Sequence, residues 1–176
     1  MNRFGRLSFT LLVAGLALAP AAHAATTGTS AVTLAAQANA MVDVLDPTLT
    51  LSPLAADYAN DYVEATGASG LRVRLKTNSS TGIALMVRCA DAVPQIALAD
   101  LLVRTQTVSP TGSTTIGSYT AITSSNQTLW SMTTAQHPWL TVTTDIRVQN
   151  LINYNDAISA GATNYTNTLT YTVVAQ

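Results

Sequence analysis

The chain has 176 residues, of which 10% are charged, with eight Lys and Arg against nine Asp and Glu. Phosphate binding needs clustered positive charge, so this balance argues against a nucleic-acid partner. A single cysteine excludes a zinc site made of several thiolates. No phosphate-binding glycine loop and no metalloprotease histidine pattern occurs, so no cofactor is expected.

The first 24 residues have the three regions of a secretory signal peptide. Arg3 and Arg6 give a positive start, an uncharged run extends from Leu7 to Ala19, and Ala22-His23-Ala24 supplies a small-residue cleavage site. The uncharged run is shorter than the roughly 20 residues that span a bilayer, which favours cleavage after Ala24 over an uncleaved anchor. The mature chain then has no membrane span.

Residues 25–30 predict a flexible leader, followed by one domain over residues 31–176. Small and medium apolar side chains recur at every second position after the leader. These are Val32, Leu34, Ala36, Ala38, Ala40, Val42 and Val44. At about 3.3 Å per residue the pattern would extend roughly 43 Å, longer than most strands. It predicts two consecutive strands or one strand that overhangs the fold, with a helix in its Ala-rich middle as a further alternative.

An irregular stretch begins at Asp46-Pro47, and its acidic part contains Asp57, Asp61 and Glu64. Carboxylate oxygens suit Ca²⁺, but the spacing is not that of an EF-hand. These three residues are therefore weak ligand candidates beside the simpler interpretation of a solvated loop. Aromatic residues that could either form a platform for sugars or fill the core are Tyr58, Tyr62, Trp130 and Trp139.

Alternating patterns predict strands over residues 71–77 and 83–90, joined as a hairpin by a turn at 78–82. The only basic cluster consists of Arg72, Arg74 and Lys76. It lies on the polar side of the first strand and indicates a solvent face rather than a site for an anionic ligand. Cys89 continues the apolar side of the second strand, which predicts a buried, reduced thiol rather than an intermolecular disulfide.

The remaining pattern consists of short strands and polar connections. Strands are predicted over residues 96–103, 119–123, 129–132, 140–149 and 165–174, with a loop or weak hairpin over 107–118. In the strand at 140–149, Val142 and Ile146 fall on the core side and Thr143 on the polar side. Seven to nine such strands with almost no helical periodicity predict an all-β, antiparallel, two-sheet immunoglobulin-like sandwich.

Several segments carry a resemblance to known proteins. They are Leu71 to Asn78 leading into Gly82 to Arg88, the step Ala99-Asp100-Leu101, the strand Thr144 to Arg147, and Gly161 to Tyr165 leading into Leu169 to Val173. Their order resembles bacterial secreted proteins with immunoglobulin-like folds, the pilin-like and WxL-like surface group. The resemblance covers most of residues 30–176, and it implies a cell-surface or fibre-building role rather than catalysis.

No constellation of acid, base and nucleophile indicates an enzyme. His137 is the only histidine after the signal peptide, and no Gly-x-Ser-x-Gly elbow occurs. Surfaces with few charges pack against copies of themselves without desolvating many ions. We therefore expect an exported, non-enzymatic structural subunit of a cell-surface filament or envelope layer, extracellular or periplasmic, whose segment 32–44 adds as a strand to a neighbouring copy. The alternative is a monomeric adhesive or carbohydrate-binding sandwich module.

Overall fold

The computed structural model describes residues 31–106, 113–154 and 164–176. The chain divides into two units, residues 1–35 and residues 36–176. In the first unit only residues 31–35 are described, so the predicted signal peptide and leader lie outside the described part. Among the described residues, all helices and strands belong to the second unit.

The described strands of the second unit form two antiparallel sheets, one of six strands and one of four. Sheet A consists of β1 (Ala40–Val44), β2 (Tyr62–Ala65), β3 (Leu71–Thr77), β5 (Leu101–Thr105), β7 (Thr120–Ala121) and β9 (Gln136–Gln149). Sheet B consists of β4 (Ile83–Cys89), β6 (Ser113–Thr115), β8 (Gln127–Met132) and β10 (Leu169–Ala175). The predicted two-sheet antiparallel sandwich is therefore confirmed.

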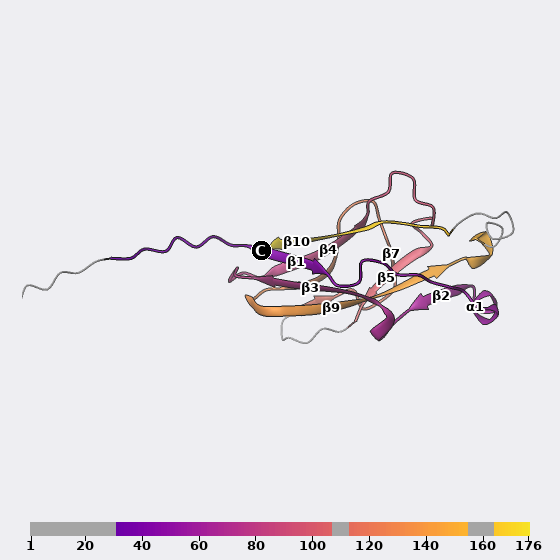
Figure 1. Ribbon diagram of the computed structural model, residues 1–176, viewed down its shortest axis with the longest axis horizontal. Helices are drawn as coiled ribbons and strands as arrows, with labels where there is room; N and C mark the ends of the chain where they lie inside the picture. The colour runs from indigo at the N-terminus through magenta and orange to yellow at the C-terminus, as the bar shows by residue number, and fades with distance from the viewer. Residues whose placement is uncertain (1–30, 107–112, 155–163) are drawn as a thin grey trace, which may run out of the picture. The chain divides into compact units, whose positions relative to one another are not determined.

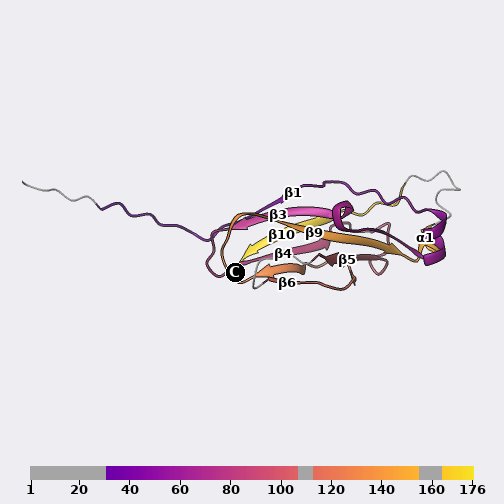
Figure 2. The same cartoon turned by 90° about the horizontal axis from the view of Figure 1, so that it is seen from below.

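The strand order leaves β1, β2 and β10 at sheet edges. Sheet A runs β1-β3-β9-β5-β7, and β2 pairs with β9 beyond the end of β3, while sheet B runs β10-β4-β8-β6. Figure 1 views the sandwich from its edge, with β10 and β4 above β3 and β9, and Figure 2 looks onto the sheets, where β1, β3, β9 and β5 follow one another. β1 and β10 lie close together without pairing.

The core lies between the sheets because each strand buries every second side chain. Val73, Leu85 and Val142 have no exposed surface, and Trp130 is also fully buried. In β9, Ile146 lies on the same buried side, as the alternation predicts. At about 25 cal/mol per Å² of apolar surface, burial on this scale supplies the main stabilisation of such a domain.

The predicted hairpin over residues 71–90 is wrong in its pairing. β3 belongs to sheet A and β4 to sheet B, so the turn carries the chain across the core. The turn needs Gly82, whose φ is +112° and whose Cβ, if present, would lie 1.9 Å from the carbonyl oxygen of Met132. Alternation reports which side of each strand is buried, and two strands that face each other across a core have the same pattern as two paired strands.

Other predicted boundaries also change. The strand expected over residues 32–44 is shortened to β1, and residues 31–39 are neither strand nor helix. The strands expected to begin at residues 96 and 165 begin at Leu101 and Leu169, because side-chain hydrogen bonds described below join the two preceding stretches to each other.

Short helices complete the described structure. They are α1 (Ala55–Asn60), η1 (Gly67–Ser69) and η2 (Leu151–Tyr154). Asp57 caps the start of α1, because its carboxylate accepts the N–H of Leu54, the residue before the helix, at 2.7 Å. No helix in the described part of the chain has the length and apolar character needed to cross a bilayer.

Candidate binding groove

One edge of the sandwich is not closed by a strand ladder. Among the described strands, β2 pairs only with β9 and β10 pairs only with β4, so one edge of each sheet is free. Residues 46–53 pass along this edge as irregular chain. They include Pro47 and Pro53, which have no N–H to give to a ladder. The two sheets therefore separate here without a shared backbone contact.

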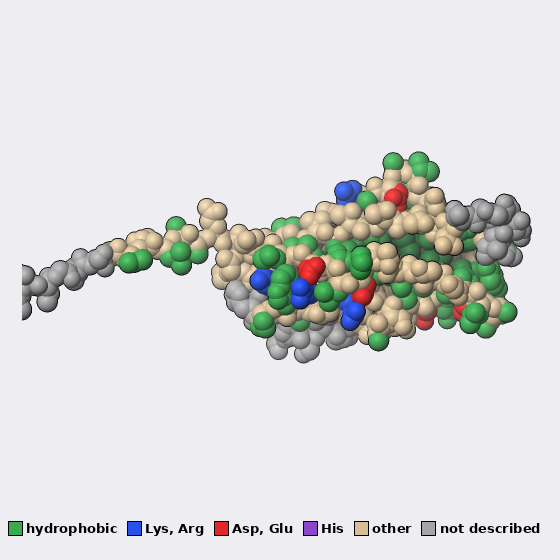
Figure 3. Space-filling model, in the orientation of Figure 1, with side chains coloured by type: hydrophobic (Ala, Val, Ile, Leu, Met, Phe, Trp, Pro, Cys, Tyr) green, Lys and Arg blue, Asp and Glu red, His purple; other side chains and the backbone are tan. Residues whose placement is uncertain are grey.

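A groove of about 700 Å³ lies along this edge, between residues 44–53 on one side and residues 164–171 on the other. In Figure 3 it is the hollow right of centre where hydrophobic side chains show between two tan ridges. Its floor consists of the core residues Val63, Leu71, Leu101, Ile146, Val148 and Leu151. The groove thus reaches the core itself.

Exposure of the core changes along the sandwich. Val63 and Leu71, which line the groove, are 9% and 8% exposed, whereas Val73 and Val142, which do not, are 0% exposed. β1 pairs with β3 opposite Val73 and covers that part of the sheet edge. The core is therefore sealed near the turn at residues 78–82 and open toward η2.

The buried hydroxyl of Tyr171 has no hydrogen-bond partner among the described residues. Tyr171 follows the start of β10 and lines the groove. Burial raises the pKa of this hydroxyl, so it stays protonated as a donor. A buried polar group without a partner costs on the order of 1–3 kcal/mol, so this hydroxyl is an unsatisfied polar group in the wall of the groove.

The free edge of β10 offers backbone groups in a definite register. The carbonyl of Thr168 accepts from the N–H of Ala90, and the N–H of Gln176 donates to the carbonyl of Gly82, so even-numbered residues face β4. In an antiparallel ladder the alternate residues face the other way. The N–H and C=O groups of Leu169, Tyr171 and Val173 therefore point to the open edge.

Two tyrosines form the end of the groove next to η2. Tyr154 donates to the carboxylate of Asp100 at 2.7 Å and accepts the N–H of Ala97 at 3.1 Å. Its ring meets that of Tyr165 edge to face, with centroids 5.0 Å apart. Burial and the bond to Asp100 raise the pKa of Tyr154 to about 12. This end wall is held by satisfied polar contacts.

Cys89 is buried and free, as the sequence predicts. Its Sγ donates to the carboxylate of Asp91 at 3.5 Å, and the same carboxylate oxygen accepts the N–H of Thr168 at 2.5 Å. Burial raises the pKa of the Cys89 thiol, which lowers its reactivity. The cysteine is therefore a buried thiol next to the start of β10.

The candidate assembly residues fall into two groups. Ala40, Val42 and Val44 form part of β1, where Val42 and Val44 remain 36% and 38% exposed. The other four precede β1 and lie outside both sheets; they are Val32, Leu34, Ala36 and Ala38. Val32 is 95% exposed and Leu34 is 88% exposed. The alternating pattern therefore continues beyond the part of the segment that its own sheet uses.

This segment leaves the second unit at a defined place. The side chain of Asn78 accepts the N–H of Asn39 at 2.6 Å and donates to the carbonyl of Gln37 at 2.8 Å. Ser79, in the same turn, donates to the carbonyl of Gln176 at 2.6 Å. The exit thus lies at the β3–β4 turn, the end of the sandwich opposite α1 (Figure 1).

The weak ligand candidates are not brought together. Asp57 bonds at the start of α1, Asp61 ends that helix with a φ of +59°, and Glu64 pairs with Arg147 at 2.7 Å. Within the described ranges, no three His, Cys, Asp or Glu residues are placed to hold a metal ion. The structure therefore offers no Ca²⁺ site at these residues.

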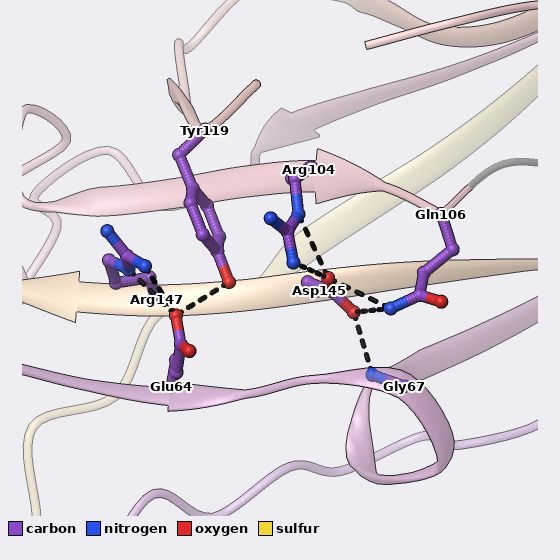
Figure 4. Close-up of polar contacts among 7 residues, drawn as sticks. All are labelled: Glu64, Gly67, Arg104, Gln106, Tyr119, Asp145 and Arg147. Carbon is purple, nitrogen blue, oxygen red and sulfur yellow. Dashed lines mark hydrogen bonds and ion pairs between the residues drawn. The ribbon is translucent and has the colours of Figure 1, made fainter. Parts of the chain in front are cut away.

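A second cluster, of paired polar side chains, lies on the outer side of sheet A (Figure 4). Asp145 is 0% exposed although it falls on the polar side of β9. Its carboxylate accepts the Gly67 N–H at 2.9 Å, the Gln106 side chain at 2.9 Å, and the Arg104 guanidinium at 2.5 Å. Burial alone would raise the pKa of Asp145, but these bonds outweigh it and hold the pKa below its usual range.

The cluster continues to β2 through Arg147. Its guanidinium lies 4.1 Å from the ring centroid of Tyr62 and 3.9 Å from that of Tyr119. Glu64 accepts from Arg147 and from the Tyr119 hydroxyl at 2.8 Å. Such stacking and pairing stabilises the sheet. We name the set Tyr62, Glu64, Arg104, Gln106, Tyr119, Asp145 and Arg147 the polar ladder. Its charged groups are paired with one another, which favours a structural role.

The aromatic residues considered as a sugar platform are not gathered at one place. Trp130 is in the core and Tyr62 stacks on Arg147. Trp139 is contacted by Lys76, whose Nζ lies 4.7 Å from the ring centroid, and by Arg74 at 4.8 Å. The basic side chains of β3 thus contact other residues of the same chain, since Arg72 also pairs with Asp46 and Arg74 with Asp43.

Comparison of the chain with protein-family models, with curated proteins and with solved structures finds no match. The groove was not predicted from the sequence. Two signals bear on it in retrospect: Leu49 and Leu51, apolar residues between Pro47 and Pro53, pack against the core from irregular chain. Apolar residues at alternate positions beside prolines indicate a covered edge that has no strand partner.

Proposed function

We propose that this protein is an exported structural subunit that joins copies of itself into a surface filament by β-strand addition. In this proposal, residues 31–36 of one copy, the donor segment, enter the groove of the next copy. The observation that carries the proposal is the groove itself, where the core and the backbone edge of β10 are both open on one side.

The donor segment and the groove match in length and chemistry. Six residues extend about 20 Å as a strand, and residues 164–171 extend about 26 Å at the same rise, which is long enough to receive the whole segment. Val32 and Leu34 are apolar and exposed, as an inserting strand needs. The edge groups of Leu169 and Tyr171 supply a backbone ladder, and the groove floor supplies apolar contacts for alternate side chains.

The positions of exit and groove favour a chain of subunits over a closed dimer. The donor segment leaves the second unit beside the β3–β4 turn. The groove opens toward η2, at the other end of this unit. One copy can therefore give its segment to a second copy and receive one from a third. Such a head-to-tail contact does not close, so it propagates into a fibre.

Two paired experiments test this function on the mature chain. Deleting residues 25–38 removes the donor segment but keeps Asn39, which is bonded to Asn78. We expect a folded or chaperone-dependent protein that forms no fibres by size-exclusion chromatography and negative-stain microscopy. Fibres that form normally from this deletion would rule out the proposed donor.

A single-residue pair gives the sharper comparison. In the full mature chain, Leu34→Asp places a charge on the side of the donor segment that enters the groove, which would cost several kcal/mol without a partner. Thr33→Asp places the same charge on the opposite side. We expect the first variant to stay monomeric and the second to polymerise. Equal behaviour of the two would contradict insertion in this register.

A further inference from the structure

The rim of the groove at residues 164–168, here called the lip, is held by side chains instead of a strand ladder. β4 ends at Cys89, and the last backbone bond to this stretch is from Ala90 to Thr168 at 2.8 Å. Beyond it, the N–H of Thr168 donates to the carboxylate of Asp91, and the N–H of Thr166 donates to the side chain of Gln95 at 2.8 Å.

Asn167 makes more of these contacts than any other described side chain in the lip. Its Oδ1 accepts the N–H groups of Gln95 and Ile96, both at 2.9 Å, and its Nδ2 donates to the carbonyl of Ile96 at 2.8 Å. One amide therefore satisfies three backbone groups, as a neighbouring strand would. Ile96 itself lines the groove and packs against the core.

We propose that Asn167 is the positioning residue of the acceptor groove, an inference that rests on the proposed function. By fixing residues 165–168 to Gln95 and Ile96, it holds the lip in line with β10, so that the edge groups of the lip and of Leu169 continue in one row. Asn is suited to this because Oδ1 accepts and Nδ2 donates; Asp would lose the donor and Ala would lose both.

The test uses two complementary variants of the mature chain. Asn167→Ala keeps a normal donor segment and has a faulty groove, whereas Leu34→Asp has a normal groove and a faulty donor segment. The loss of three hydrogen bonds should weaken docking by at least about tenfold. We expect neither variant to polymerise alone, and an equimolar mixture to form a one-to-one complex and nothing longer, measured by light scattering after size exclusion.

Each outcome decides the inference. If Asn167→Ala polymerises like the wild type, Asn167 does not position the groove, while the proposed function stands. If the mixture gives no complex although circular dichroism shows both variants folded, Asn167 acts elsewhere and the inference fails. If the wild type itself never associates, the proposed function fails first. Asn126→Ala is the matched control, since Asn126 is exposed just before β8 and does not line the groove, and it should polymerise normally.

Discussion

The outer side of sheet A and the open edge of the sandwich differ in how their buried polar groups are hydrogen-bonded. In the polar ladder, Asp145 is 0% exposed and accepts hydrogen bonds from Gly67, Arg104 and Gln106. At the open edge, Tyr171 has a buried hydroxyl with no described partner. The difference is that Asp145 is paired within the chain, whereas the Tyr171 hydroxyl is unpaired among the described residues.

The largest effect should come from the core that both regions share. Val142→Asp places a carboxylate where the side chain has no exposed surface, and we expect the protein not to fold, a cost of about 4 kcal/mol or more. Thr143→Asp lies on the other side of β9 and should be mild. Urea denaturation of both variants checks this, and equal effects would contradict the register of β9.

Breaking the polar ladder should cost somewhat less. Asp145→Ala leaves the Gly67 N–H and the Arg104 guanidinium without their acceptor, and we expect the free energy of unfolding to fall by about 3 kcal/mol. The control is Asp43→Ala, which removes an exposed pair with Arg74 and should cost less than about 1 kcal/mol. Similar losses of unfolding free energy in the two variants would show that the polar ladder stabilises the fold no more than an exposed ion pair does.

Acid should weaken the polar ladder. Burial alone would raise the pKa values of Asp145 and Glu64, but their hydrogen bonds to arginine outweigh burial and lower both. Groups with lowered pKa values in the folded state stabilise it above their unfolded values of about 4, and this stability is lost as the pH falls through the folded values. Denaturation midpoints between pH 7 and pH 2 should therefore fall steeply below about pH 4.

A variant without the Asp145 carboxylate sharpens that experiment. Asp145→Asn should reduce the stability at pH 7 and also flatten its decline in acid, because one of the titrating groups is gone. If the slope below about pH 4 were the same in the wild type and in Asp145→Asn, the acid sensitivity would have to come from other carboxylates.

The smallest effect concerns the open edge. Tyr171→Phe removes a buried hydroxyl that has no described partner, so the unfolding free energy of the subunit should stay the same or rise by up to about 1 kcal/mol. The same change should make fibres dissociate more readily if an inserted strand accepts the hydroxyl proton. A clear loss of subunit stability would instead indicate a partner within the chain.

The sequence predicted the parts of the fold that depend on alternation. It identified the buried side of β9 and the burial of Cys89, because both follow from a period of two. It failed for the turn at Gly82, where crossing the core and pairing within a sheet require the same pattern. It also failed for Asp145, which alternation places toward solvent and which Gly67 and Arg104 cover from distant positions.

The groove could not be predicted for a related reason. It arises because residues 46–53 and the lip are irregular, and the irregularity of the lip depends on side-chain bonds between residues more than 70 positions apart, such as that of Asn167 to Ile96. Such long-range bonds have no local signal. The donor segment did have one, since its alternation continues beyond β1.

The single thiol of the chain gives a direct view of motion at the lip. Asp91 accepts hydrogen bonds both from Cys89 and from the backbone of Thr168, so the lip cannot leave its place without also changing the cover of the sulfur. The rate of alkylation of Cys89 in the native state would then report the free energy of this local opening, in the manner of amide exchange. A subunit within a fibre and a free subunit should differ in this alkylation rate.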